Sequence, residues 1–186
     1  MSNFERLLER HRIELQHALH NFEVWKTLEN RDDETARVLN AFRGFFNLTI
    51  EAIKTQFVIN IMNIAGSDYR LPNVHRLLKM IDRDEALAPD LDTRVIRKRL
   101  KQLRPIILKL KTLRDRRAAH WDMETPPEDP TLGEVETILR GLETIFHEIT
   151  MAAQPGHHWP LTYSEHSHTE SFLRTLRESW AKKRAQ

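Results

Sequence analysis

Apolar residues recur every three or four positions along most of this chain, which is the spacing of a buried helix face. The first run follows Ser2 and Glu5, a pair that is typical of an N-terminal capping box. This run predicts a helix over residues 3–28, before the polar residues 29–33 interrupt the pattern. The positions expected to face the core are Phe4, Leu8, His11, Leu15, Ala18, Phe22 and Trp25.

A second and more apolar run predicts a helix from Val38 to about Gly66. Its many β-branched residues would suit a strand, but its length and its period of three to four favour a buried helix. The positions expected in the core are Val38, Phe42, Phe45, Leu48, Ala52, Lys54, Phe57, Ile61 and Ile64. The same spacing predicts that the aromatic residues of this region pack in the core and do not line a ligand pocket: Phe42, Phe45, Phe46 and Phe57.

Four further segments carry a helical pattern. A short helix is expected around residues 74–81, with Val74, Leu77, Leu78 and Ile81 as its apolar face. A basic helix should begin after Asp92 as N-cap and bend or divide at Pro105; its core positions are Ile96, Leu100, Leu103, Ile107 and Leu110. Thr131 and Glu134 form a second capping box before a helix that ends near Pro155, with Val135, Ile138, Leu142, Ile145 and Ile149 as its core stripe. A last amphipathic segment carries Phe172, Leu176 and Trp180. Together these segments predict one all-α domain over residues 1–186, a bundle of five or six helices.

Composition removes several classes of chemistry from consideration. The chain has no cysteine, which excludes a disulfide framework, a thiolate zinc site and a cysteine nucleophile. Its N-terminus is charged and lacks the apolar stretch of a secretory signal peptide, and polar residues repeatedly interrupt the apolar region between Val38 and Ala65. We therefore expect a cytoplasmic protein with no membrane span.

Charge is unevenly distributed along the chain. One segment is strongly basic and contains a single acid, Asp115; its cations are Arg94, Arg97, Lys98, Arg99, Lys101, Arg104, Lys109, Lys111, Arg114, Arg116 and Arg117. Residues 124–170 are acidic, with Arg140 as their one basic residue among Lys and Arg. A basic element of this kind is typical of a protein with a polyanionic partner, although a solvated helix face explains it equally well.

The residues at the end of the basic helix suggest a reactive site. If the helix continued, its buried stripe would pass from Leu110 to Arg114, then to Arg117 and Trp121. A buried arginine without a partner is costly, so either the helix leaves the core here or these charges face a cleft or a second chain. His120 can take and return a proton near neutral pH, and a fixed guanidinium can stabilise the charge of a phosphorane-like transition state. A charged turn with one histidine is nevertheless more often structural than catalytic.

The segment Arg114-Asp115-Arg116-Arg117-Ala118-Ala119-His120-Trp121-Asp122 resembles the signature of the HEPN superfamily, an arginine separated from a histidine by four to six residues. Asp115 stands where that superfamily favours Asn, Asp or His. The form Arg-Asp-Arg-x-x-Ala-His-x-Asp is similar to the AbiU-type abortive-infection branch, and the resemblance extends over residues 41–149.

The resemblance implies a homodimer in which two such motifs face each other in one cleft and cleave RNA without a metal or a cofactor. Proteins of this kind serve as toxins or antiviral effectors, often silenced by a cognate antitoxin. In this chain His120 would act as general base or acid, Arg114 would stabilise the transition state, and Asp115 would hold the pair in place. The supporting positions would be Arg116, Arg117 and Lys111 for the RNA backbone, with Asp122 and Trp121 beside the histidine. Some family toxins are silenced by nucleotidylation at a tyrosine two residues after the histidine; this chain has Asp122 there, so that control is not expected.

Three alternatives stay open at this point. On a continuous helix Arg116, four residues before His120, shares its face, whereas Arg114 lies about 120° away. Family spacing therefore favours Arg114 and helical geometry favours Arg116.

The protein could also be a non-catalytic helical dimer that binds nucleotide, RNA or a partner protein, or a purely structural interaction protein. The histidines His157, His158, His166 and His168 could suggest a metal site, but adjacent histidines generally point apart, and we expect no metal.

Overall fold

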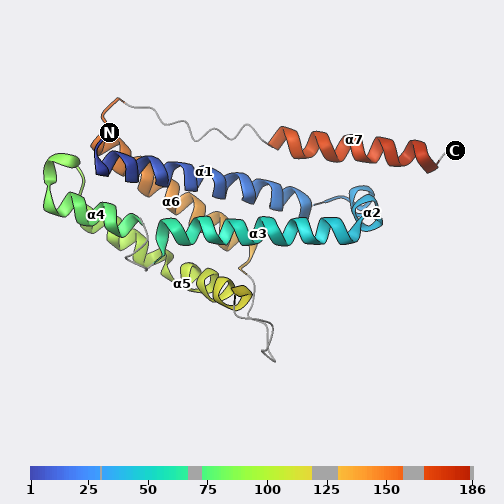
Figure 1. Cartoon of the computed structure of the whole chain (residues 1–186), viewed down its shortest axis with the longest axis horizontal. Helices are drawn as coiled ribbons and strands as arrows, with labels where there is room; N and C mark the ends of the chain where they lie inside the picture. Colours follow the sequence, from blue (N-terminus) through green and yellow to red (C-terminus); the bar gives the residue numbers. More distant parts are fainter. Residues whose placement is uncertain (30, 67–72, 119–129, 157–165, 185–186) are drawn as a thin grey trace. The chain divides into compact units, whose positions relative to one another are not determined.

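The computed structural model describes residues 1–29, 31–66, 73–118, 130–156 and 166–184, and these residues contain helices and no strand (Figure 1). The elements are α1 (Asn3–Glu29), α2 (Asp33–Ala41), α3 (Arg43–Ala65), α4 (Val74–Arg83), the short 3-10 turn η1 (Glu85–Leu87), α5 (Thr93–Ala118), α6 (Leu132–Ala153) and α7 (His166–Arg184). The all-α prediction is confirmed. The prediction of five or six helices is wrong, because the described residues form seven α-helices.

The additional helix arises because the second predicted helix is broken near its start. α2 begins at the N-cap Asp32, whose carboxylate accepts a hydrogen bond from the backbone N–H of Thr35 at 2.7 Å. It ends at Phe42, which leaves helical geometry with φ −117° and ψ 33° while its N–H still bonds to the carbonyl of Leu39. α3 then starts at Arg43 as a separate helix.

The break goes with a change in which residues are buried close to it. Four positions expected in the core are exposed: Phe42 at 44%, Phe45 at 64%, Leu48 at 72%, and Ala52. Phe46 and Ile50 are buried there in their place. Further along α3 the expected core positions Phe57, Ile61 and Ile64 are buried, as predicted. The aromatic residues of this region are therefore divided between core and surface, which corrects the expectation that all of them pack inside.

The chain divides into two compact units. The first contains residues 1–18 and 58–161, and the second contains residues 19–57 and 162–186, so α1 and α3 contribute to both. The expectation of one domain over residues 1–186 stays a prediction.

The core of the first unit is formed by α1, α3, α4, α5 and α6. Fully buried side chains include Leu8, Leu15, Ile61, Leu77, Leu78, Ile96, Leu110, Ile138 and Leu142. α5 packs against α6, and a Cβ added to Gly141 would lie 2.8 Å from a methyl group of Leu103. Glycine at position 141 therefore allows the closest approach of α6 to the Leu103 side chain.

Two buried polar groups of the first unit, on α1 and α3, have partners within the described residues. The Glu14 carboxylate accepts hydrogen bonds from the side-chain amides of Asn60 at 2.7 Å and Asn63 at 3.2 Å, which joins α1 to α3. His11 is 1% exposed; its Nδ1 lies 2.6 Å from the carbonyl oxygen of Leu7, and its ring stacks on Phe146. The core position that the sequence predicted for His11 is confirmed.

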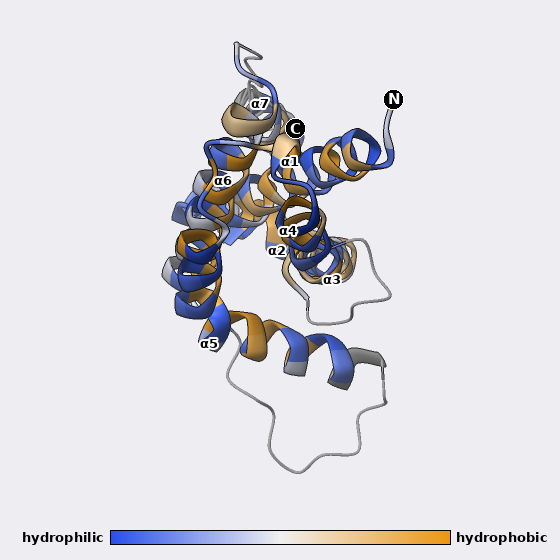
Figure 2. Ribbon diagram, turned by 90° about the vertical axis from the view of Figure 1, so that its left-hand side faces the viewer, coloured by the Kyte–Doolittle hydropathy of each residue, from blue (hydrophilic) through white to orange (hydrophobic). Residues whose placement is uncertain are grey.

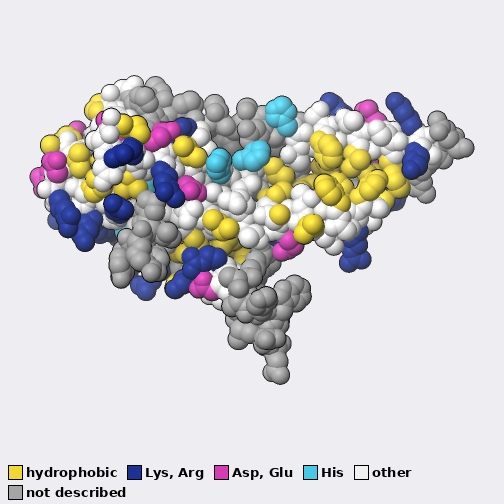
Figure 3. Space-filling model, viewed as in Figure 1, with side chains coloured by type: hydrophobic (Ala, Val, Ile, Leu, Met, Phe, Trp, Pro, Cys, Tyr) yellow, Lys and Arg dark blue, Asp and Glu magenta, His cyan; other side chains and the backbone are white. Residues whose placement is uncertain are grey.

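The second unit is held by aromatic packing and by contacts of α7 with α2. Phe22, Trp25 and Phe57 pack against one another, and Lys54 lies over Trp25 while it pairs with Glu29 at 2.6 Å. α7 buries Leu173, whereas Phe172, expected on its apolar face, is 52% exposed. Figure 3 shows exposed hydrophobic side chains, in yellow, over this part of the molecule. No helix of the described residues has the length and apolarity that crossing a membrane requires.

Candidate functional site

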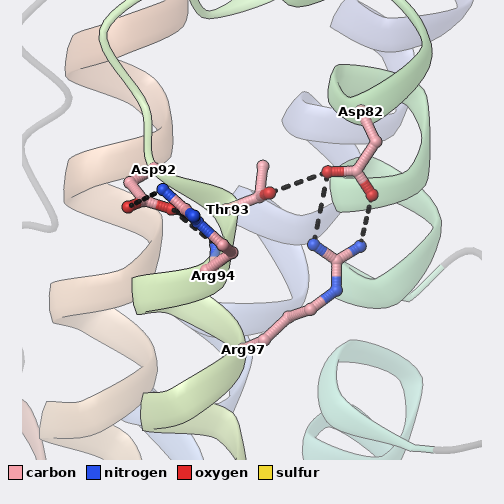
Figure 4. A network of polar contacts seen from close by, with 5 residues as sticks. All are labelled: Asp82, Asp92, Thr93, Arg94 and Arg97. Atoms are coloured by element: carbon pink, nitrogen blue, oxygen red, sulfur yellow. Dashed lines mark hydrogen bonds and ion pairs between the residues drawn. The ribbon is translucent and has the colours of Figure 1, made fainter.

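The start of the basic helix α5 is fixed by two aspartates. The Asp92 carboxylate accepts a hydrogen bond from the backbone N–H of Arg94 at 2.9 Å, as expected for an N-cap. Asp82 of α4 accepts bonds from Thr93 at 2.7 Å and from both terminal nitrogens of Arg97 (Figure 4). These bonds, with that of Arg97 first, hold the pKa of Asp82 below its ordinary value. The N-terminal part of α5 is therefore anchored to α4.

Pro105 lies inside α5, and the helix continues beyond it to Ala118. Figure 2 shows α5 changing direction part-way along its length. A proline inside a helix removes one backbone hydrogen bond and clashes with the preceding turn, so a bend is the expected response. The helix was predicted to bend or divide at Pro105, and the bend is what α5 shows.

After Leu110 the buried stripe of α5 comes to an end. Ile96, Leu100, Leu103 and Leu110 are buried, whereas Leu113 is only half-buried and the side chain of Arg114 is 36% exposed. Arg114 is therefore not enclosed in the core, and the possibility that these charges face a cleft or a second chain stays a prediction. The Arg114 guanidinium is accessible to solvent and to a ligand.

Arg114 and Asp115 form the part of the predicted site that the structure describes. Nε and Nη2 of Arg114 both donate to Oδ1 of Asp115, at 2.9 Å and 2.7 Å. The Asp115 side chain is 50% exposed, so this is a surface ion pair. Two bonds to one oxygen restrict the rotation of the guanidinium. The expected role of Asp115, to hold Arg114 and His120 in place, stays a prediction.

The remaining predicted residues are described less fully. Lys111 is half-buried on α5, and the backbones of Arg116 and Arg117 belong to the last turns of the same helix. His120, Trp121 and Asp122 lie outside the described residues, as do His157 and His158. The choice between Arg114 and Arg116 as partner of His120 therefore stays a prediction. Elsewhere in the described part of the chain, no three His, Asp or Glu side chains gather as a metal site would require.

Intramolecular partners account for much of the charge of α5. Among the α5 side chains that the structure describes, five cations are paired: Arg94 with Asp92, Arg97 with Asp82, Arg99 with Glu148, Lys109 with Glu134, and Arg114 with Asp115. Glu134 and Glu148 belong to α6, so the basic helix packs on an acidic one. Part of the charge asymmetry in the sequence thus reflects the complementarity of two neighbouring helices.

No chemistry was expected of α4, although this short helix carries three exposed cations, Arg76, Lys79 and Arg83. They recur at intervals of three and four positions, which places them along one side of a helix. The same spacing rule that found the apolar stripe of α4 would have identified this basic stripe.

The described residues form helices and no strand, and a partly exposed arginine lies on α5 six positions before a histidine in the sequence, as the HEPN resemblance implies. The family model of AbiU2, a branch of the HEPN domains, matches residues 1–178. The chain therefore belongs to the AbiU2 family, and the likeness extends on both sides of residues 41–149. No curated protein and no solved structure matches the chain, so the assignment rests on the family model.

Proposed function

We propose that this protein is a metal-independent endoribonuclease of the toxin or abortive-infection type, active as a homodimer. The observation that carries the proposal is the Arg114–Asp115 pair at the point where α5 leaves the core, six residues before His120, in a chain of the AbiU2 family. The proposal draws further support from the charge and exposure of this helix end.

His120 is the proton-transfer group of the proposed reaction. As general base it takes the proton of the ribose 2′-hydroxyl, whose oxygen attacks the adjacent phosphorus. The bond to the 5′-oxygen breaks, and a protonated histidine returns a proton to that leaving oxygen. The products are a 2′,3′-cyclic phosphate and a 5′-hydroxyl, so no water and no metal ion enters the cleavage step. DNA lacks the 2′-hydroxyl and is not a substrate.

Arg114 stabilises the charge that develops on the phosphate oxygens. A guanidinium has more N–H donors than the two that bond to Asp115, so it can hold the carboxylate and a phosphate oxygen together. Asp115 acts as a positioning residue through Arg114. Arg116, Arg117 and Lys111 attract the RNA backbone, and Trp121 and Asp122 support the histidine.

A second copy of the chain completes the site in this proposal. On one helix Arg114 and His120 would point in different directions, and a two-fold axis can bring the arginine of one protomer to the histidine of its partner. Half-buried apolar residues surround the bend of α5, and Leu108 is 49% exposed. An apolar surface of this kind beside Arg114 suits contact with another copy. A cognate antitoxin that covers the same helix end would keep the enzyme silent.

One observation favours a second candidate function. Arg114 is already paired, and so are four other cations of α5, which reduces the charge available to a phosphate. A non-catalytic helical dimer that binds nucleotide, RNA or a partner protein would need no free catalytic arginine.

A cleavage assay in EDTA decides between the two functions. Purified wild-type protein and His120→Ala are incubated with single-stranded RNA and with DNA of the same sequence, and the ends of the products are identified. We expect the wild type to cut RNA alone and leave 2′,3′-cyclic phosphates, and His120→Ala to be inactive although folded. RNA binding without cleavage by the wild type would favour the second candidate.

A further inference from the structure

α4 presents an exposed basic face in the first unit. Its apolar residues Val74, Leu77, Leu78 and Ile81 are buried. On the opposite side His75, Arg76, Lys79 and Arg83 are exposed. Figure 3 shows Lys and Arg side chains, in dark blue, gathered where α4 lies in Figure 1. Because α4 has fewer than three turns, these cations are concentrated on a short length of helix.

A hollow of about 640 Å³ elsewhere in the chain has Asp32 and Glu170 in its lining, whereas no acid is among the described residues that line the hollow over α4. The α4 hollow measures about 480 Å³, and its polar lining consists of Asn3, Asn73, His75, Arg76, Lys79 and Arg83. It therefore combines three permanent cations with amide and imidazole groups. This composition suits an anion with several hydrogen-bond acceptors, such as a phosphate group.

Neighbouring acids are committed to other contacts. Asp82 faces α5, where it binds Arg97 and Thr93 (Figure 4), and Asp84 accepts from the backbone N–H of Ala86. Within the described ranges, no ion pair of Arg76, Lys79 or Arg83 is formed, in contrast to the five paired cations of α5. The positive charge of α4 is thus less neutralised than that of the helix singled out by the sequence.

The geometry of α4 favours a chain of phosphates over a single one. Arg76 and Arg83 are seven residues apart, about 10 Å along a helix, with Lys79 between them. Cations in a row of this length can contact successive phosphates of one strand. α4 contacts α5 at Arg97. The distance along α5 from Arg97 to Arg114 is at most about 25 Å, which is the length of roughly seven phosphates of a stacked strand.

We propose that the α4 hollow is an exosite for the phosphate backbone of RNA, separate from Arg114. The inference rests on the proposed function, because it treats RNA as the substrate. The exosite binds the part of a long RNA that extends beyond the cleavage segment. Short RNAs reach the cleavage segment without touching α4.

The test measures RNA binding as a function of salt. In a His120→Ala background, the triple variant Arg76→Ala/Lys79→Ala/Arg83→Ala is compared with Arg10→Ala/Arg37→Ala/Lys182→Ala, which removes the same charges from exposed positions elsewhere. The probe is a fluorescent single-stranded RNA of about 20 nucleotides. Loss of three phosphate contacts should reduce the steepness of the slope of log K against log salt by about 2. If the lines of the variant and of its parent meet near 1 M salt, the variant binds RNA about a hundredfold more weakly at 0.1 M. The control triple variant should keep the wild-type slope.

Several results would overturn the exosite. They are an unchanged slope for the α4 variant, an equal loss in the control, or competition by poly-glutamate as strong as that by RNA. If the triple variant is unstable, the test is repeated with the single substitution Lys79→Glu, which is at an exposed position. A salt slope equal to that of the His120→Ala parent would again refute the exosite. Cleavage is scored separately with His120 intact: the α4 variant should cut an RNA of about 4 nucleotides at the wild-type rate and longer RNA more slowly. If the wild type cleaves RNA but the α4 variant keeps the parental salt slope, the exosite alone is refuted. If RNA binding depends on α4 but the wild type cleaves no RNA, the nuclease alone is refuted.

Discussion

His11 gives the stability of this protein a specific dependence on pH. Its ring is buried between α1 and Phe146 of α6, where Nδ1 donates to the carbonyl of Leu7 and Nε2 has no partner among the described groups. Burial lowers the pKa of His11 to about 4, and the charge of Arg10 adds to this, while the Leu7 carbonyl and Glu14 oppose it. The folded protein therefore holds this histidine in its neutral form.

The magnitude follows from the difference between the folded and unfolded pKa. The unfolded chain binds the proton near pH 6.5, whereas the folded protein resists it until about pH 4. Stability from His11 is fully present above pH 6.5 and is lost as pH falls toward 4, because protons are then taken up preferentially by the unfolded chain. The loss should reach about 2 kcal/mol at pH 5 and about 3 kcal/mol below pH 4.

Urea unfolding of the wild type, His11→Gln and His17→Gln near pH 7.5 and pH 5 checks this expectation. The wild type should lose about 2 kcal/mol more than His11→Gln between the two pH values, since glutamine does not titrate. His17→Gln removes an exposed histidine of the same helix and should follow the wild type. Equal pH dependence of all three proteins would refute the reasoning.

Other substitutions test the packing and the site. Leu110→Ala removes a fully buried side chain of α5 and should lower the free energy of unfolding by about 2–5 kcal/mol, measured in urea; a change under about 1 kcal/mol would contradict its place in the core. Gly141→Val forces a side chain against Leu103 and should cost about 1–3 kcal/mol in the same assay, whereas wild-type stability would contradict the close approach. Arg114→Ala should lower the RNA cleavage rate about a hundredfold and Arg116→Ala much less; the reverse order would assign the catalytic role to Arg116.

Local interactions explain what the sequence predicted well. The capping boxes at Ser2 and at Thr131 involve residues three apart, and both form at the expected helix starts. All seven core positions expected on the first helix are buried, because no break interrupts its period. Helix starts and uninterrupted stripes can be read from neighbouring residues alone.

The break at Phe42 could not be predicted in the same way. Gly44 lies two positions after the break but inside the first turn of α3, and no proline is near: the Phe42 N–H bonds to the carbonyls of Leu39 and Asn40 as α2 ends, and α3 begins at the next residue. Its ring contacts Trp180 of α7, more than a hundred positions away. Contacts between residues this distant leave no periodic signal.

The partners of the α5 cations could not be predicted for a similar reason. The sequence shows a basic segment and, further on, an acidic one, but not that Lys109 meets Glu134 or that Arg99 meets Glu148. Those pairs depend on how α5 packs against α6. The segment Arg114–Asp122 was found from two signals: the stripe that changes from apolar to charged at Arg114, and the family signature.

A mixed dimer tests the central claim, an endoribonuclease site shared between two chains. Arg114→Ala and His120→Ala protomers carrying different tags are co-expressed, and the heterodimer is purified through both tags and assayed for RNA cleavage in EDTA. If the arginine of one protomer serves the histidine of its partner, one of the two sites is intact, and the heterodimer should have about half the wild-type rate while both mutant homodimers are inactive. An inactive heterodimer beside an active wild type would contradict the shared site, and a wild type that cuts no RNA would contradict the nuclease itself.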